Sequence, residues 1–251
     1  MKIFIKNKVF FILTAIIPLL TVTCADTTDD KVKEASAFLG DSLIITGEQV
    51  WVPNYNTGKI SQMLSKFDGN RDVDVIVIEY TNDSQNFNIQ EVGTGKVEKG
   101  KLSFNVNKLA ESNLLESDDL VLHYINEWYD NNGNITVNPP TVKGNLISLV
   151  TQYDNDSSIP SEGIIKEGFH GTRTSLTGEY IYYIYVDDAC TISAGKVVKT
   201  ELQYTFNKFT LSLKPGWNTI LKSETYTTTG DSSYSITVSN PEIRWLMQDI
   251  K

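Results

Sequence analysis

Short runs of β-branched and aromatic residues, separated by turn-forming residues, recur along most of this chain and constrain its fold more than any other feature. Val73 to Tyr80 is a nearly continuous apolar run, and Tyr180 to Val186 is rich in tyrosine and isoleucine. Such residues favour extended backbone, and Gly, Pro, Asn, Asp and Ser bound most of the runs. The pattern predicts an all-β, β-sandwich-like protein with few helices.

The clearest local prediction is a hairpin over residues 97–106. Lys99 and Gly100 supply the two turn residues, and Leu102, Phe104 and Val106 alternate with polar residues on the returning strand. A period of two places alternate side chains on one face of a sheet. We therefore expect these three side chains to point into a core.

A polar cluster, Asp154 to Ser158 before Pro160, predicts a boundary between two small β-domains. The first domain would span 40–157 and the second 158–251. A short likeness between Ile45–Trp51 and Leu176–Tyr182 is not followed by further matching residues, which favours chance over duplication.

Residues 1–23 have the layout of a signal peptide. Lys2, Lys6 and Lys8 form a basic start, and an apolar run from Val9 to Leu20 follows them. That run is about a dozen residues, whereas a transmembrane helix needs roughly 20. The length therefore favours a cleaved export signal over a membrane-spanning anchor.

Cys24 indicates which kind of signal this is. Leu20-Thr21-Val22-Thr23-Cys24 resembles a bacterial lipobox, in which the cysteine is lipidated and becomes the first residue of the mature protein. Threonines stand where Leu and a small residue are usual, as in the relaxed lipoboxes of spirochaetes. We expect a palmitate-bearing lipoprotein held in a membrane through Cys24. The alternative is ordinary cleavage near Thr23 and secretion.

A polar tether is expected between the lipid and the β-fold, over residues 24–39, with a helical turn or two between Lys31 and Leu39. Ala25 follows the cysteine and Asp26 comes one place later, so the familiar inner-membrane retention signal is not matched. We therefore expect the protein in the cell envelope, in the outer membrane or at the surface.

The net charge and the number of cysteines exclude some classes of binding partner and of covalent cross-link. Loss of the three signal lysines moves the formal net charge from −9 to −12. An acidic protein repels nucleic acid and anionic lipid, so the expected membrane contact is through the lipid alone. Cys190 has no partner within the chain if Cys24 is acylated, and we expect it to be a small buried residue of a strand.

Several short blocks are similar to segments of uncharacterised envelope lipoproteins of treponemes and related bacteria. They are Thr46–Trp51, Gly95–Phe104, Leu213–Asn218 with its Lys-x-Gly-Trp-Asn turn, the preceding strand Tyr183–Asp187 and the closing Trp245. The resemblance covers most of the mature chain in scattered pieces. It implies an envelope lipoprotein and no activity, cofactor or functional residue.

Gly40-Asp41-Ser42-Leu43 spells the nucleophile block of the GDSL esterases. In that family the partner histidine follows an aspartate by three residues. Leu120 stands at that place before His123, and Glu167 stands at it before His170. The match covers four residues, and the sequence offers neither the partner base nor the α/β scaffold of these esterases. We therefore expect Ser42 to start a strand and not to act as a nucleophile. No catalytic residue is expected.

Metal and cofactor sites are not expected either. Two histidines are too few for a histidine-rich metal site, and a half-buried structural role suits His123. The acidic turns Asp130–Asn134, Asp154–Asp156 and Asp187–Asp188 could offer oxygen ligands to calcium. Turn chemistry alone explains such Asx-rich runs and is the favoured interpretation.

The aromatic residues leave two alternatives, sugar stacking and core packing. Trp217 and Trp245 stand inside strand-like patterns, which favours the core. Trp128 and Tyr129 run into a polar turn and are the best ligand-facing pair. The predicted function is a surface binding or adhesion module for a glycan or a host protein. An envelope hydrolase and a purely structural envelope protein are the alternatives.

Overall fold

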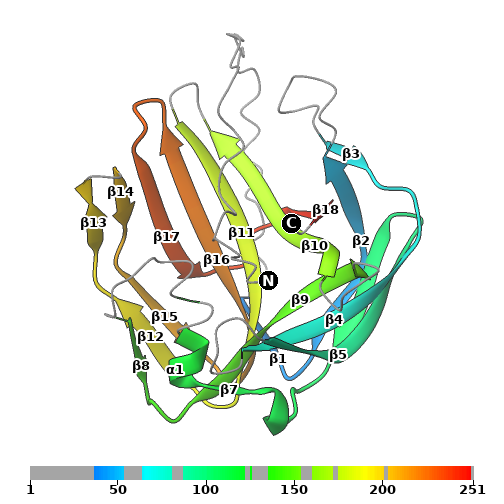
Figure 1. Cartoon of the computed structure of the whole chain (residues 1–251), viewed down its shortest axis with the longest axis horizontal. Coiled ribbons are helices and arrows are strands. Elements are labelled where there is room, and N and C mark those ends of the chain that lie inside the picture. Colours follow the sequence, from blue (N-terminus) through cyan, green and yellow to red (C-terminus); the bar gives the residue numbers. More distant parts are fainter. Residues whose placement is uncertain are drawn as a thin grey trace, which may run out of the picture.

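The structure is a computed structural model of the chain, shown as a cartoon in Figure 1. It describes residues 37–53, 64–80, 87–121, 125, 135–153, 160–171, 175–200 and 203–249. Within these ranges, no helix has the length and apolar character needed to cross a membrane.

The prediction of an all-β fold is confirmed. The strands are β1 (Phe38–Gly40), β2 (Leu43–Pro53), β3 (Leu64–Lys66), β4 (Arg71–Tyr80), β5 (Phe87–Glu98), β6 (Lys101–Val106), β7 (Leu115–Glu116), β8 (Ile135–Asn138), β9 (Lys143–Tyr153), β10 (Pro160–Gly171), β11 (Ser175–Val186), β12 (Cys190–Ala194), β13 (Val197–Lys199), β14 (Tyr204–Phe206), β15 (Phe209–Leu213), β16 (Gly216–Thr227), β17 (Ser232–Val238) and β18 (Arg244–Asp249). The described helices are the short α1 (Ser117–Leu120) and the 3-10 turn η3 (Glu111–Asn113).

Part of the main sheet closes on itself into a seven-stranded barrel in the order β10-β18-β2-β6-β5-β4-β9. The ring closes where β9 pairs with β10, with Leu149 opposite Ile164. The C-terminal strand β18 lies parallel to β2, and Trp245 pairs with Val50. The main sheet therefore curls into a barrel because β9 pairs with β4 on one side and with β10 on the other.

Beside the barrel, the sheet continues as an extension through β11, β16, β17, β14 and β13, at the left of Figure 1. A separate three-stranded sheet, β15-β12-β8, covers one face of this extension, and residues of the two sheets share a hydrophobic cluster. A sandwich-like contact between two sheets is thus present at this side of the molecule.

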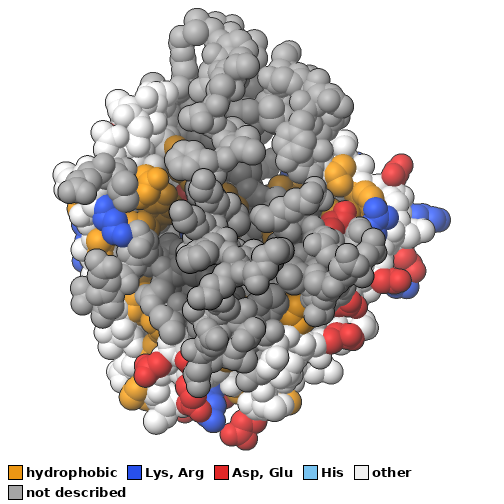
Figure 2. Space-filling model, viewed as in Figure 1, with side chains coloured by type: hydrophobic (Ala, Val, Ile, Leu, Met, Phe, Trp, Pro, Cys, Tyr) orange, Lys and Arg blue, Asp and Glu red, His pale blue; other side chains and the backbone are white. Residues whose placement is uncertain are grey.

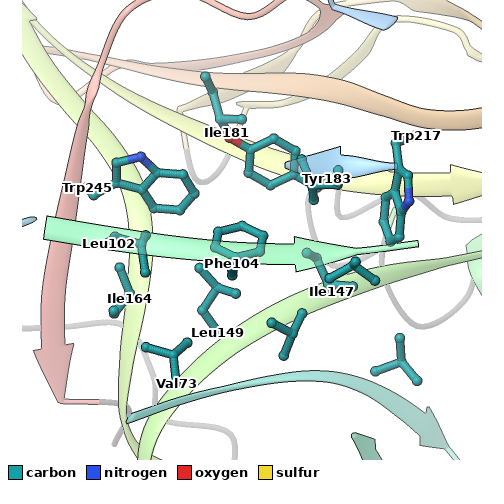
Figure 3. Packing of buried hydrophobic residues seen from close by; sticks show 14 of the residues in the cluster. Val73, Leu102, Phe104, Ile147, Leu149, Ile164, Ile181, Tyr183, Trp217 and Trp245 are labelled. Atoms are coloured by element: carbon teal, nitrogen blue, oxygen red, sulfur yellow. The ribbon is translucent and has the colours of Figure 1, made fainter. Parts of the chain in front are cut away.

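Strand β11 contributes to two hydrophobic cores because successive side chains of a strand point to opposite faces. Ile181, Tyr183 and Tyr185 belong to the barrel core, part of which is drawn in Figure 3. Ile184 and Val186 belong to the second core, between the extension and the three-stranded sheet. The faces of β11 are therefore an inner face, toward the barrel core, and an outer face.

The segments 40–157 and 158–251, expected as separate β-domains, share one sheet and one core. Val50 and Phe104 from the first segment pack in the same cluster as Tyr183 and Trp245 from the second. The polar cluster expected as the boundary lies outside the described residues. β18 also pairs with β2, across almost the whole chain, and no local turn signal reveals such a pairing.

The hairpin predicted over residues 97–106 is confirmed. Lys99 and Gly100 have φ values of 48° and 74°, as a two-residue turn of type I′ requires. The three alternating residues of β6, Leu102, Phe104 and Val106, are buried. The apolar run of β4 is also buried on both faces, as its near-continuous pattern predicts.

The end of the expected tether belongs to the fold. Residues 38 and 39 lie in β1, which pairs with β16 and places Phe38 opposite Asn218. The backbone N–H and the hydroxyl of the fully buried Thr219 donate to the carbonyl of Ala37, at 2.7 Å and 2.9 Å. Buried donors need an acceptor, which explains why residues 38–40 form a strand here. Most of the segment in which a helical turn is expected, residues 31–36, lies outside the described residues.

Candidate functional site

The inner face of the extension changes from apolar to hydroxyl-bearing partway along its strands. On β16, Trp217 and Leu221 pack in or against the barrel core, and Ser223, Thr225 and Thr227 continue on the same face. On β11, Ile181 in the core is followed on that face by Glu179 and Thr177. Beyond the barrel core, the inner face therefore offers polar side chains.

Strand register aligns four of these hydroxyls in a row across four strands. Thr205 of β14 pairs with Ser233 of β17, Ser233 with Thr225 of β16, and Thr225 with Thr177 of β11. The hydroxyl oxygens of Thr177 and Thr225 are 3.1 Å apart. We call Thr205, Ser233, Thr225 and Thr177 the hydroxyl row. Two residues further along the strands, Ser235, Ser223 and Glu179 form a second aligned set.

A cavity of about 400 Å³ lies over the part of the hydroxyl row that belongs to β14, β17 and β16. Thr205, Ser233 and Thr225 of the row line it, together with Gln203 and Asp231. The remaining lining residues are Val198, Lys199, Thr200, Tyr204, Thr227 and Ser232. Among the described residues, the lining thus combines six hydroxyl side chains and one amide with one acid, one lysine, one aromatic residue and the exposed Val198.

Gln203 holds an unfavourable backbone conformation beside the cavity. Its φ of 56° lies in the left-handed region, which costs a non-glycine residue roughly 1–2 kcal/mol. The N–H of Ser232 donates to the carbonyl of Gln203 at 2.9 Å, and Gly230 leaves space for the Gln203 amide oxygen, which would lie 3.0 Å from a Cβ there. Strain of this kind is concentrated at functional sites.

The turn between β16 and β17 fixes another part of the cavity wall. The N–H of Thr227 donates to the carbonyl of Asp231 at 2.9 Å, and the N–H of Asp231 donates to the Thr227 hydroxyl at 3.1 Å. The Thr229 hydroxyl donates to the Asp231 carboxylate at 2.7 Å. The carboxylate therefore helps to hold the turn.

A buried charged cluster lies on the outer face, directly behind the hydroxyl row. Glu224 is only 3 % exposed and accepts from the ammonium of Lys222 at 2.5 Å and from the hydroxyl of Tyr226. Burial raises the pKa of Tyr226, and Glu224 raises it further. Burial and Glu224 also raise the pKa of Tyr234 to about 12. These partners fix β16 and β17 from behind and give the row a rigid support.

A second polar group lies at the barrel core, where the indole N–H of Trp245 donates to Glu48 at 2.5 Å. Tyr183 stacks on Trp245 with 5.9 Å between ring centroids, and Phe104 meets the same indole edge-on (Figure 3). Burial, and then the charge of Glu48, raise the pKa of Tyr183. Both stacked rings are almost fully buried, so they leave little surface for a ligand.

The tryptophans predicted to be in the core are there. Trp217 is fully buried, meets Tyr185 edge-on at 5.3 Å between ring centroids, and donates its indole N–H to the carbonyl of Asn107 at 3.3 Å. Trp245 is 2 % exposed. Trp51, in contrast, is half-buried, and the guanidinium of Arg244 lies 4.6 Å from its ring.

Ser42 directly precedes β2, as the prediction of a strand start requires. Its hydroxyl donates to the side-chain oxygen of Asn107 at 3.2 Å. Cys190 is a buried free thiol of β12, and burial raises its pKa to about 11, which confirms the predicted structural role. The Asp187 carboxylate accepts from the backbone N–H of Lys143, far away in the sequence, and the Asp188 carboxylate accepts from the N–H of Ala189 within its own turn.

Several sequence-predicted residues lie outside the described residues. They are Cys24, Trp128, Tyr129, His123 and the acidic turns 130–134 and 154–156. The side chain of His170 is likewise not described. In the part of the chain that is described, no three His, Cys, Asp or Glu side chains gather where they could hold a metal ion.

The hydroxyl row was not found from the sequence, although a signal for it exists. Thr225-Tyr226-Thr227 and Ser233-Tyr234-Ser235 both alternate hydroxyl and aromatic residues, which is a period of two. Each run alone predicts a strand with one polar face. Only the register between β14, β17, β16 and β11 aligns the hydroxyls of separate strands.

No protein-family model, no curated protein and no solved structure matches this chain. Function is therefore inferred from its own residues.

Proposed function

We propose that this chain is a lipid-anchored envelope protein whose β-fold binds a saccharide in the cavity over the hydroxyl row. The observation that carries the proposal is the alignment of Thr205, Ser233 and Thr225 in the cavity lining. Each hydroxyl donates one hydrogen bond and accepts two, so a row of them complements the hydroxyls of a sugar. The ring of Tyr204, the aromatic residue of the lining, packs edge-on against Tyr234 in the second core, so the polar side chains of the row carry the proposed contact.

The envelope part of the proposal is supported by the basic start, short apolar run and lipobox-like ending at Cys24, and by the resemblance to treponeme-type lipoproteins. The place where the chain enters the fold also suits an anchored binding module. β1 pairs with β16 at Trp217 and Asn218, whereas the cavity is lined by Thr225 and Thr227 near the other end of β16. Attachment and binding thus use different ends of one strand.

Binding suits the cavity better than hydrolysis does. A glycosidase needs two carboxyl groups on either side of the scissile bond. Among the described residues that line the cavity, Asp231 is the single carboxylate, and the Thr229 hydroxyl already donates to it. The envelope hydrolase stays the alternative, and esterase activity that Ser42→Ala removes would favour it.

The test is a glycan-array screen with soluble residues 25–251, followed by calorimetric titration of the saccharides it selects. In the test variant, Thr225→Val and Ser233→Ala remove two hydroxyls of the row with little change of shape. The matched control carries Thr210→Val and Ser212→Ala, two exposed hydroxyl positions on β15 of the other sheet.

We expect the test variant to lose at least tenfold in affinity, because each lost partner leaves a sugar hydroxyl unpaired at a cost of about 1–3 kcal/mol. The control should bind like the parent, and both variants should keep the parent's circular dichroism. Equal losses in the two variants, or no saccharide binding by the parent, would overturn the proposal. Trp128→Ala enters the same titration as the test of the predicted Trp128–Tyr129 contact.

A further inference from the structure

We infer that the saccharide is a neutral oligosaccharide lying across the strands along the hydroxyl row, so that it extends beyond the cavity toward the barrel. This inference rests on the saccharide-binding function proposed above and names the form of its ligand. It begins from the fact that the cavity lining includes Thr205, Ser233 and Thr225 but not Thr177.

The row is longer than one sugar. Adjacent strands lie about 4.8 Å apart, so the three steps from Thr205 on β14 to Thr177 on β11 cover roughly 14 Å. Thr177 is half-buried and lies within hydrogen-bonding distance of the Thr225 hydroxyl, at 3.1 Å. The hydroxyl surface is therefore continuous across β16 and β11, past the edge of the cavity.

A second aligned set strengthens the match to a chain-like ligand. Ser235, Ser223 and Glu179 run parallel to the hydroxyl row, about 7 Å from it, which is the advance of two residues along a strand. A sugar chain carries hydroxyls along both of its edges. Two parallel lines of donors and acceptors can contact both edges, whereas a single sugar would use one end of each line.

Charge favours an uncharged chain over an acidic one. Asp231 lines the cavity at the turn between β16 and β17, and Glu179 ends the second set on the barrel side, so an anionic saccharide would meet a carboxylate at both places. Among the described residues of the cavity lining, Lys199 is the one cation. Acidic side chains also gather along the lower and right-hand margins of the face in Figure 2. The formal net charge, −12 without the three signal lysines, adds to the repulsion of anionic glycans.

The experiment is a chain-length titration of soluble residues 25–251 with N-acetylglucosamine, chitobiose, chitotriose and chitotetraose. We expect the affinity to rise at least tenfold from the single sugar to the trisaccharide and then to level off. Thr177→Val should weaken trisaccharide binding severalfold and binding of the single sugar much less. Ser223→Ala tests the second set in the same way, and Thr210→Val on β15 is the control.

Two results would show that the ligand occupies the cavity alone. One is equal affinity for all four chain lengths, and the other is an equal loss of affinity for the single sugar and the trisaccharide in Thr177→Val. Either result overturns this inference and leaves the proposed function standing. The same holds if the series does not bind while another saccharide on the array does. Failure of every glycan on the array overturns the proposed function itself.

Discussion

Trp217→Ala is the sharpest test of how the barrel and the extension are held together. Trp217 starts β16 after the Lys214-Pro215-Gly216 turn and is fully buried in the barrel core. It touches Tyr185 edge-on and donates to the carbonyl of Asn107. The residue therefore connects β16 and β11 to the segment that follows β6.

The expected loss follows from those contacts. Truncating a buried tryptophan costs about 3–5 kcal/mol. The lost edge-to-face pair with Tyr185 adds roughly 0.5–1.5 kcal/mol, and the Asn107 carbonyl left without its donor adds about 1 kcal/mol. The truncation cost already includes part of the packing with Tyr185, so we expect the free energy of unfolding to fall by about 5 kcal/mol in total. Domains are stable by about 5–15 kcal/mol, so this is a large share.

The assay is urea and thermal unfolding of soluble residues 25–251 followed by circular dichroism. For a chain of this size, 5 kcal/mol corresponds to a fall of roughly 10–20 °C in melting temperature. The control is Trp51→Ala, which removes a half-buried indole with Arg244 over its ring and should cost only about 1–2 kcal/mol. An unchanged melting temperature in Trp217→Ala, with ligand binding lost, would mean that Trp217 is a surface contact and would refute the core assignment.

Three further predictions concern other parts of the molecule. Gly100→Ala should lower the free energy of unfolding, measured in urea, far more than Gly47→Ala does. Both glycines have a positive φ. A Cβ at Gly100 would lie 1.7 Å from the carbonyl oxygen of Phe67, whereas no atom lies within 4 Å of a Cβ at Gly47. The fold raises the pKa of Tyr234 from 10.0 to about 12, so the folded state favours the neutral tyrosine. The free energy of unfolding should therefore stay constant up to about pH 10 and decline between pH 10 and pH 12, where only the unfolded state loses the proton. Tyr234→Phe should reduce that decline. A pH profile unchanged by the substitution would contradict the raised pKa of Tyr234. Cys24→Ala should abolish metabolic labelling with palmitate and release the protein from the membrane fraction; continued partitioning into detergent would count against lipidation.

Local chemistry explains what could be predicted from the sequence. The hairpin at Lys99-Gly100 is set by two turn residues and the alternation that follows them, all within ten residues. Trp217 could be assigned to the core because a turn and a strand pattern surround it. Cys190 needed only its strand context and the absence of a partner cysteine. Each of these inferences depends on neighbours in sequence.

Long-range pairing explains what could not be predicted. Closure of the barrel depends on contacts of β9 with β4 and β10 and of β18 with β2, and no short pattern specifies them. The hydroxyl row depends on the register of four strands, since a shift of one residue would turn Thr225 to the outer face and Glu224 to the inner one. The strand at Phe38 forms because Thr219 needs an acceptor, and Thr219 lies far along the chain.

The place of β18 in the barrel has a consequence for biogenesis. The last strand of the chain lies between β10 and β2, and until it emerges both of those strands keep an unpaired edge. Contacts of such high sequence separation form slowly. The chain therefore cannot complete its fold during synthesis, before residues 244–249 have left the ribosome.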